Sequence, residues 1–156
     1  MERKCVKIII KSSCGYFCRQ PWSDRLVLTP LLVTYNLKIE NERFIGGTKK
    51  TLSWKKNFDE EEQKQANKAL EFANIFNFFM DHTPVLDGEG LEVVLYFDDK
   101  TKQSYYTTYG GCVEEYYGDL HTLLQLISPL IDNDSNKPDY FIGEEPEYES
   151  CEEEED

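Results

Sequence analysis

Two small groups of side chains in the sequence could do chemistry, and the first is a pair of thiols. Cys14 and Cys18 are the closest cysteines in the chain, with three residues between them. Deprotonated cysteines are good zinc ligands, but this spacing is one residue longer than the common zinc-binding and redox pairs, and no second close pair follows. The spacing therefore favours two free thiols in an ordinary loop. Cys14 and Cys18 stay as candidate metal ligands, and no cofactor is predicted.

The second group combines a possible nucleophile with a possible base. Cys112, Asp119 and His121 lie close together in the sequence. A cysteine becomes a nucleophile when its pKa is lowered and a base such as histidine lies within hydrogen-bond reach. Neighbours in sequence without a wider family pattern seldom converge in space. We therefore predict no catalytic site, and keep a small enzyme with a Cys/His pair as the alternative.

A set of aromatic side chains is better suited to binding a protein than to catalysis. Tyrosine is favoured at interfaces because it offers a large contact area and a polar tip. We predict that these residues contact a partner, although tyrosine is also an ordinary residue of half-exposed strands. The candidates are Tyr105, Tyr106, Tyr109, Tyr116, Tyr117 and Trp22. Trp22 belongs to a loop that we expect over residues 14–24.

The strands that must position these side chains are predicted from alternation of apolar and polar residues. This alternation runs through 4–13, 31–39 and 51–55, and residues 31–39 show it most strongly. Residues 91–97 and 103–109 alternate in the same way on either side of an Asp-Asp-Lys turn, which is typical of a hairpin.

Two helices are predicted from apolar residues that recur every three and four positions. The first runs over 59–81 and starts at Asp59, with Glu62 completing a capping box. The second runs over 117–131, and Pro129 should kink it or end it early. Strands joined by hairpins, with only two helices, predict an α+β fold. We expect a mostly antiparallel sheet of about five or six strands covered by the two helices.

Charge divides the chain of 156 residues, whose net charge is −13, into three unequal parts. Residues 1–57 carry a net charge of +8, residues 58–139 one of −12, and residues 140–156 one of −9. The first part holds most of the predicted strands, so the exposed face of those strands should be positive. We expect a single domain over 1–142 and a disordered acidic tail over 143–156. The tail serves a basic partner, mimics DNA, solubilises the chain, or folds back onto the basic strands.

These features narrow the function without identifying it. The acidic balance disfavours nucleic acid as a partner. No apolar run is long enough to span a membrane and no signal peptide is present, so a cytoplasmic protein is expected. We predict a small non-enzymatic regulator, inhibitor or immunity-type protein that binds a basic protein partner. The alternatives are the Cys/His enzyme, a thiolate metal module, or a charge asymmetry that is purely structural.

Overall fold

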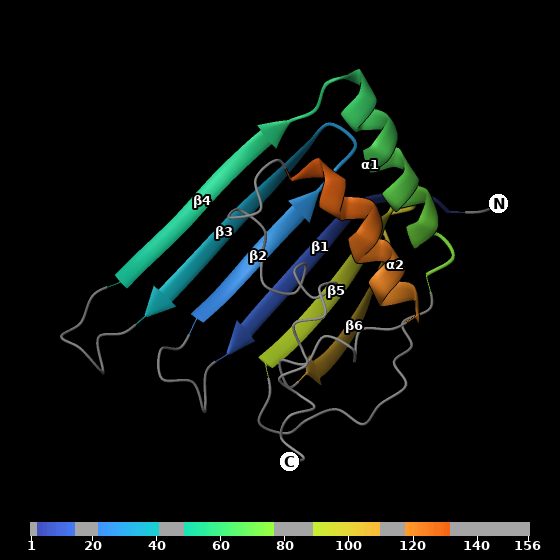
Figure 1. Ribbon diagram of the computed structural model, residues 1–156. Helices are drawn as coiled ribbons and strands as arrows, with labels where there is room; N and C mark the ends of the chain where they lie inside the picture. Colours follow the sequence, from blue (N-terminus) through green and yellow to red (C-terminus); the bar gives the residue numbers. More distant parts are fainter. Residues whose placement is uncertain (1–2, 15–21, 41–48, 77–88, 110–117, 132–156) are drawn as a thin grey trace, which may run out of the picture.

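The computed structural model describes residues 3–14, 22–40, 49–76, 89–109 and 118–131 (Figure 1). These residues form the predicted α+β fold, with one six-stranded antiparallel sheet and two α-helices. The elements are β1 (Cys5–Cys14), β2 (Trp22–Leu28), β3 (Leu32–Glu40), β4 (Lys49–Asn57), α1 (Glu60–Ala73), β5 (Glu89–Phe97), β6 (Lys102–Tyr109), α2 (Gly118–Ile127) and the short 3₁₀ helix η2 (Ser128–Leu130).

The sheet has the strand order β4-β3-β2-β1-β5-β6, and every neighbouring pair is antiparallel. Strand β1 lies in the interior of the sheet, where neighbouring strands on both sides help to bury the side chains of its three consecutive isoleucines. Ile8 and Ile10 belong to the core beneath the helices, and Ile9, which points to the opposite side, is only 1% exposed. Strands β4 and β6 form the two edges.

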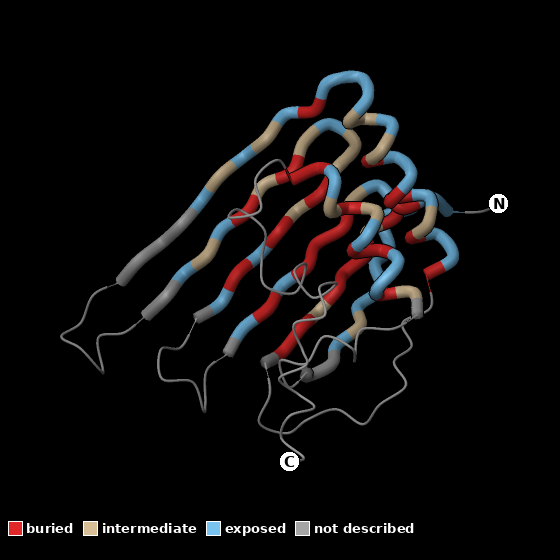
Figure 2. Tube along the Cα trace, in the orientation of Figure 1, coloured by how far each residue is buried: buried red, intermediate tan, exposed pale blue. Residues whose placement is uncertain are grey.

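Both helices lie across the same face of the sheet, and α1 packs against α2 (Figures 1 and 2). Their apolar sides meet the alternate residues of the central strands, which produces one continuous hydrophobic core. Helix α2 ends at Ile127, early as Pro129 predicts, and the chain continues as the short helix η2. No helix among the described residues is long and apolar enough to cross a membrane.

Helix α1 starts as the sequence predicts but ends earlier. Asp59 accepts a hydrogen bond from the Glu62 N–H (2.8 Å), and Glu62 accepts one from the Asp59 N–H (2.9 Å), which completes the capping box. The helix then stops at Ala73 rather than near residue 81. Asn74 follows as the C-cap, and its side-chain oxygen accepts a hydrogen bond from the Cys5 N–H (2.7 Å). Periodicity could not reveal this link to β1.

The segment expected to be a loop over 14–24 contains the start of a strand. β2 begins at Trp22 and pairs with β1 and β3 along its whole length. The alternation was hidden because Asp24 occupies an inward position and is 8% exposed. Its carboxylate accepts hydrogen bonds from the Ser12 N–H (2.9 Å), the Ser12 hydroxyl (2.7 Å) and the Tyr35 hydroxyl (2.7 Å). These bonds compensate for burial of the charge.

Candidate functional site

The face of the sheet opposite the helices, here called the open face, carries mostly polar side chains. Antiparallel register places residues of this face in rows that cross the strands. One row runs Asn36, Arg25, Lys11, Glu92 and Tyr106, from β3 to β6. Apart from the half-buried Glu92, these side chains are exposed. Sequence positions far apart therefore meet on one surface.

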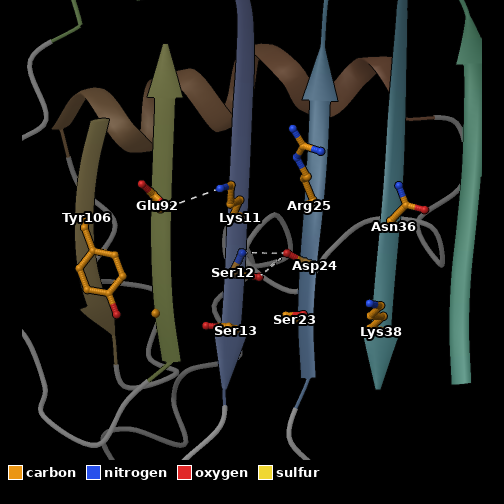
Figure 3. A pocket seen from close by; sticks show the side chains of 11 residues that line it. Lys11, Ser12, Ser13, Ser23, Asp24, Arg25, Asn36, Lys38, Glu92 and Tyr106 are labelled. Carbon is orange, nitrogen blue, oxygen red and sulfur yellow. Dashed lines mark hydrogen bonds and ion pairs between the residues drawn. The ribbon is translucent and has the colours of Figure 1, made fainter. Parts of the chain in front are cut away.

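A hollow of about 660 Å³ lies on this face (Figure 3). Its shape follows from side-chain size in the next row of the register. Ser13 stands between Ser23 on β2 and Gly90 on β5, so the middle of this row holds only small side chains. Longer side chains from the neighbouring positions surround it. Those lining the hollow are Lys11, Arg25, Asn36, Lys38, Glu92 and Tyr106.

Glycine at position 90 allows a tyrosine to form one wall of the hollow. A Cβ atom at this position would lie 2.6 Å from the Tyr106 hydroxyl oxygen and 3.3 Å from two of the ring carbons. Tyr106 therefore leans over the β5 backbone at Gly90, which is buried, while the tyrosine itself remains 65% exposed. Figure 3 shows the ring beside β5, on the side of the sheet away from the helices.

The open face is strongly basic although the chain as a whole is acidic. Lys11 lies near Glu92, but its ammonium nitrogen is 4.0 Å from the carboxylate oxygen and both side chains are partly exposed. An exposed pair at this distance contributes little and leaves the cation accessible. Among the described side chains of this face, six are cationic and only Glu92 is acidic. The cations are Lys7, Lys11, Arg25, Lys38, Lys55 and Lys102.

Outside the hollow, the open face continues as an aromatic group held between two cations. The Lys7 ammonium lies 4.5 Å from the centre of the Tyr96 ring, and that of Lys102 lies 5.8 Å from it. These cations face the electron-rich surface of the ring, an attractive arrangement. The positive surface therefore extends beyond the hollow toward β5 and β6.

The predicted partner-binding tyrosines do not share one surface. Successive strand residues point to opposite faces, so Tyr106 is exposed on the open face while Tyr105 packs against the core, with its ring 5.3 Å from that of Phe76. The backbones of Trp22 and Tyr109 lie in β2 and β6, but their side chains are not described. Tyr116 and Tyr117 lie outside the described residues.

The candidate catalytic residues are only partly placed. His121 is exposed on α2, and Asp119 is half-buried two positions earlier, a spacing at which helical side chains do not face each other. Cys112 lies outside the described residues, so the Cys/His site stays a prediction.

The candidate metal ligands are placed in a similar way. The backbone of Cys14 ends β1, whereas Cys18 lies outside the described residues. Within the part of the chain that the structure describes, no group of three or more His, Cys, Asp or Glu side chains could hold a metal ion.

Several lining residues of the hollow were not singled out in the sequence. Ser13, Ser23, Asn36 and Gly90 are common polar or small residues, and only the register of the sheet brings them together. The available signal was the basic character of the first third, which predicted a positive exposed face. Comparison with protein-family models, with curated proteins and with solved structures gave no match.

Proposed function

We propose that this chain is a non-enzymatic interaction protein whose open face binds an acidic segment of a partner protein. The observation that supports it is the hollow, whose rim carries Lys11, Arg25 and Lys38 around a floor of small polar residues. Guanidinium and ammonium groups donate charge-assisted hydrogen bonds to carboxylates. The serine hydroxyls and the Asn36 amide add neutral donors. A short acidic segment would find many donors, and the carboxylates among the lining residues are Glu92 and the largely buried Asp24.

A protein segment fits this face better than a nucleic acid does. A long polyanion senses the charge of the whole protein, which is −13. A short acidic peptide is governed by charges within about one Debye length, roughly 8 Å at physiological ionic strength. Binding such a segment would suit the regulator or inhibitor predicted from the sequence.

A basic partner, which the sequence also predicted, would bind a different surface of the protein. Glu60 and Glu71 are exposed on α1, away from the open face. A basic partner would use such acidic side chains and would be indifferent to the cations of the hollow. The two versions can therefore be separated by substitution.

The test compares two triple variants of equal net charge. Lys11→Gln, Arg25→Gln and Lys38→Gln together remove the cations of the hollow. The matched control, Lys64→Gln, Lys68→Gln and Lys100→Gln, removes three exposed lysines elsewhere. Both variants change the net charge from −13 to −16. Fluorescence anisotropy is measured in 50 mM and 300 mM NaCl with fluorescein-labelled decaglutamate, decalysine and a ten-nucleotide single-stranded DNA.

We expect decaglutamate to bind the wild type and the control, and to bind more weakly at the higher salt concentration. Each exposed cation contributes about 0.2–1 kcal/mol, so removing the three cations should weaken binding by about three- to a hundredfold. Equal affinity of the two variants, or no binding in 50 mM NaCl, would contradict the proposal. Tighter binding of decalysine would favour the basic partner, and tighter binding of DNA a nucleic-acid ligand.

A further inference from the structure

The two edges of the sheet differ in their suitability for pairing with another strand. An edge strand presents unpaired backbone N–H and C=O groups and can accept a further strand unless something prevents it. β6 is one such edge, and its register with β5 is unbroken from Glu89–Tyr109 to Tyr96–Lys102. Residues 102–104 and Tyr106 are exposed. This part of the edge is therefore accessible.

Lysine is distributed very unevenly between the two edges. Native sheets commonly protect an edge with charged side chains, lysine in particular. β4 carries Lys49, Lys50, Lys55 and Lys56 in nine residues. β6 begins with Lys102, and its last six residues are all serine, tyrosine or threonine. Tyrosine and threonine are good strand formers, and none of the six residues is charged. Only β4 therefore has the usual protection.

The register of self-pairing strengthens this contrast for β4. Two identical strands that pair antiparallel about a two-fold axis place residues of the same face opposite each other. If two β4 strands pair about Leu52, Lys49 faces Lys55 of the second copy. If they pair about Ser53, Lys50 faces Lys56. The register about Leu52 therefore opposes like charges twice, which is destabilising, whereas in the register about Ser53 the repulsion is reduced because Lys56 forms an ion pair with Glu62 at 2.7 Å.

Self-pairing of β6 avoids this repulsion. If two β6 strands pair about Tyr105, Lys102 faces Thr108 of the second copy. If they pair about Tyr106, Lys102 lies opposite the position after the end of the strand. Neither register opposes two charges, and both pair serine, threonine and tyrosine across the strands.

We propose that two copies of this chain associate through β6 and form a symmetric dimer with one continuous twelve-stranded sheet. The proposal does not depend on the proposed function. Because the two-fold axis is normal to the sheet, both hollows would face the same side. With strands about 4.8 Å apart, their centres would be about 20–25 Å apart. Such a dimer could hold two acidic segments of one partner at once.

The test measures the mass of the full chain in solution at protein concentrations from 1 to 200 μM. Ser104→Lys with Thr108→Lys adds two charges to the open-face side of β6. Pairing about Tyr105 would then oppose Lys102 and residue 108, and pairing about Tyr106 would oppose residues 104 and 108. The matched control, Ser53→Lys with Asn57→Lys, adds two charges to β4, and circular dichroism checks the folding of both variants.

We expect the wild type and the β4 control to dimerise, and the β6 variant to dimerise at least tenfold more weakly. Each copy carries a net charge of −13, so dimerisation should strengthen when NaCl is raised from 50 to 500 mM, because salt screens the repulsion. Acidic-peptide binding has the opposite salt dependence, so failure of the dimer and failure of the proposed function are distinguishable.

A second measurement keeps the proposal testable if the lysine variant is poorly folded. A chain with Lys102→Gln, Ser104→Glu and Thr108→Glu is mixed with the lysine variant, and native mass spectrometry counts the two homodimers and the heterodimer. Lys102→Gln prevents an attractive pair between residues 102 and 108 in the glutamate homodimer, so in either register only the heterodimer places opposite charges face to face and should dominate. A wild-type monomer at 200 μM in 500 mM NaCl, equal weakening by the β4 and β6 lysine variants, or no excess of heterodimer would overturn the proposal.

Discussion

Asp24 is the buried charge beneath the hollow, and its removal should destabilise the protein strongly. The carboxylate accepts hydrogen bonds from two groups of Ser12 and from the Tyr35 hydroxyl, at 2.7–2.9 Å. Asp24→Ala takes the acceptor from all three donors in a site that water barely reaches. Each donor left unsatisfied costs about 1–3 kcal/mol, and the alanine variant is relieved of burying a charge. We expect a net loss of about 3–4 kcal/mol.

Two milder variants separate the contributions to this loss. Asp24→Asn keeps the shape and one acceptor oxygen, so it should cost about 1–2 kcal/mol. Tyr35→Phe removes one donor and keeps the ring that stacks on Trp54, with 5.6 Å between the ring centres, so about 1 kcal/mol is expected. Combining Asp24→Ala with Tyr35→Phe should cost less than the sum of the single changes, because both remove the same hydrogen bond.

Urea unfolding followed by tryptophan fluorescence at pH 7 measures these differences. For a domain of this size, 3–4 kcal/mol corresponds to a melting temperature lower by about 10 °C. A stability of 5–15 kcal/mol is typical, so Asp24→Ala should still fold at room temperature. A cost below 1 kcal/mol for Asp24→Ala, or a stabilised Asp24→Asn variant, would refute the reasoning. Burial of the charge would then outweigh its hydrogen bonds.

Three further outcomes are expected. Gly90→Ala should push the flexible Tyr106 side chain aside. Thermal unfolding should show a loss of stability under about 1 kcal/mol, and decaglutamate should bind more weakly. Unchanged binding would exclude Tyr106 as a wall of the hollow. Burial raises the pKa of the Cys5 thiol from 9.0 to about 11. The Cys5 thiol therefore ionises at lower pH in the unfolded chain than in the folded one, so its contribution to the free energy of unfolding is present below pH 9 and should be lost as the pH rises toward 11. Urea titrations should not find this loss in the Cys5→Ala variant. The sequence predicts that residues 143–156 form a disordered acidic tail, and such tails make few stabilising contacts, so removing these residues should leave the melting temperature within about 2 °C. A clear drop would show that they brace the basic strands.

The sequence was sufficient for elements in which local pattern and tertiary packing agree. Strand β1, the hairpin of β5 and β6 and the start of α1 follow from alternation, turn residues and the capping box at Asp59. Two features depended on contacts between distant residues. β2 was missed because the inward Asp24 interrupts its apolar pattern, and the end of α1 is marked by Asn74, whose side-chain oxygen accepts a hydrogen bond from the distant Cys5 N–H. Neither contact leaves a local signal.

The candidate site was predictable only as a charge. The excess of lysine and arginine in the first third predicted a positive face, but the hollow depends on which small residues share a row. Ser13, Ser23 and Gly90 belong to three strands, and a shift of one residue in any strand would place its side chain on the helix face. Without strand order and register, these residues cannot be distinguished from other small residues of the chain.

The opposed charges of the chain give the two proposals a common physical test. The net charge of −13 repels a second copy, whereas the six cations of the open face attract acidic groups locally. Added salt weakens both forces. Dimerisation through β6 should therefore become stronger, and binding of an acidic peptide in the hollow weaker, over the same range of NaCl concentration. If both responses have the same sign, the charges of the open face and of the whole chain do not act separately, and one of the two proposals is wrong.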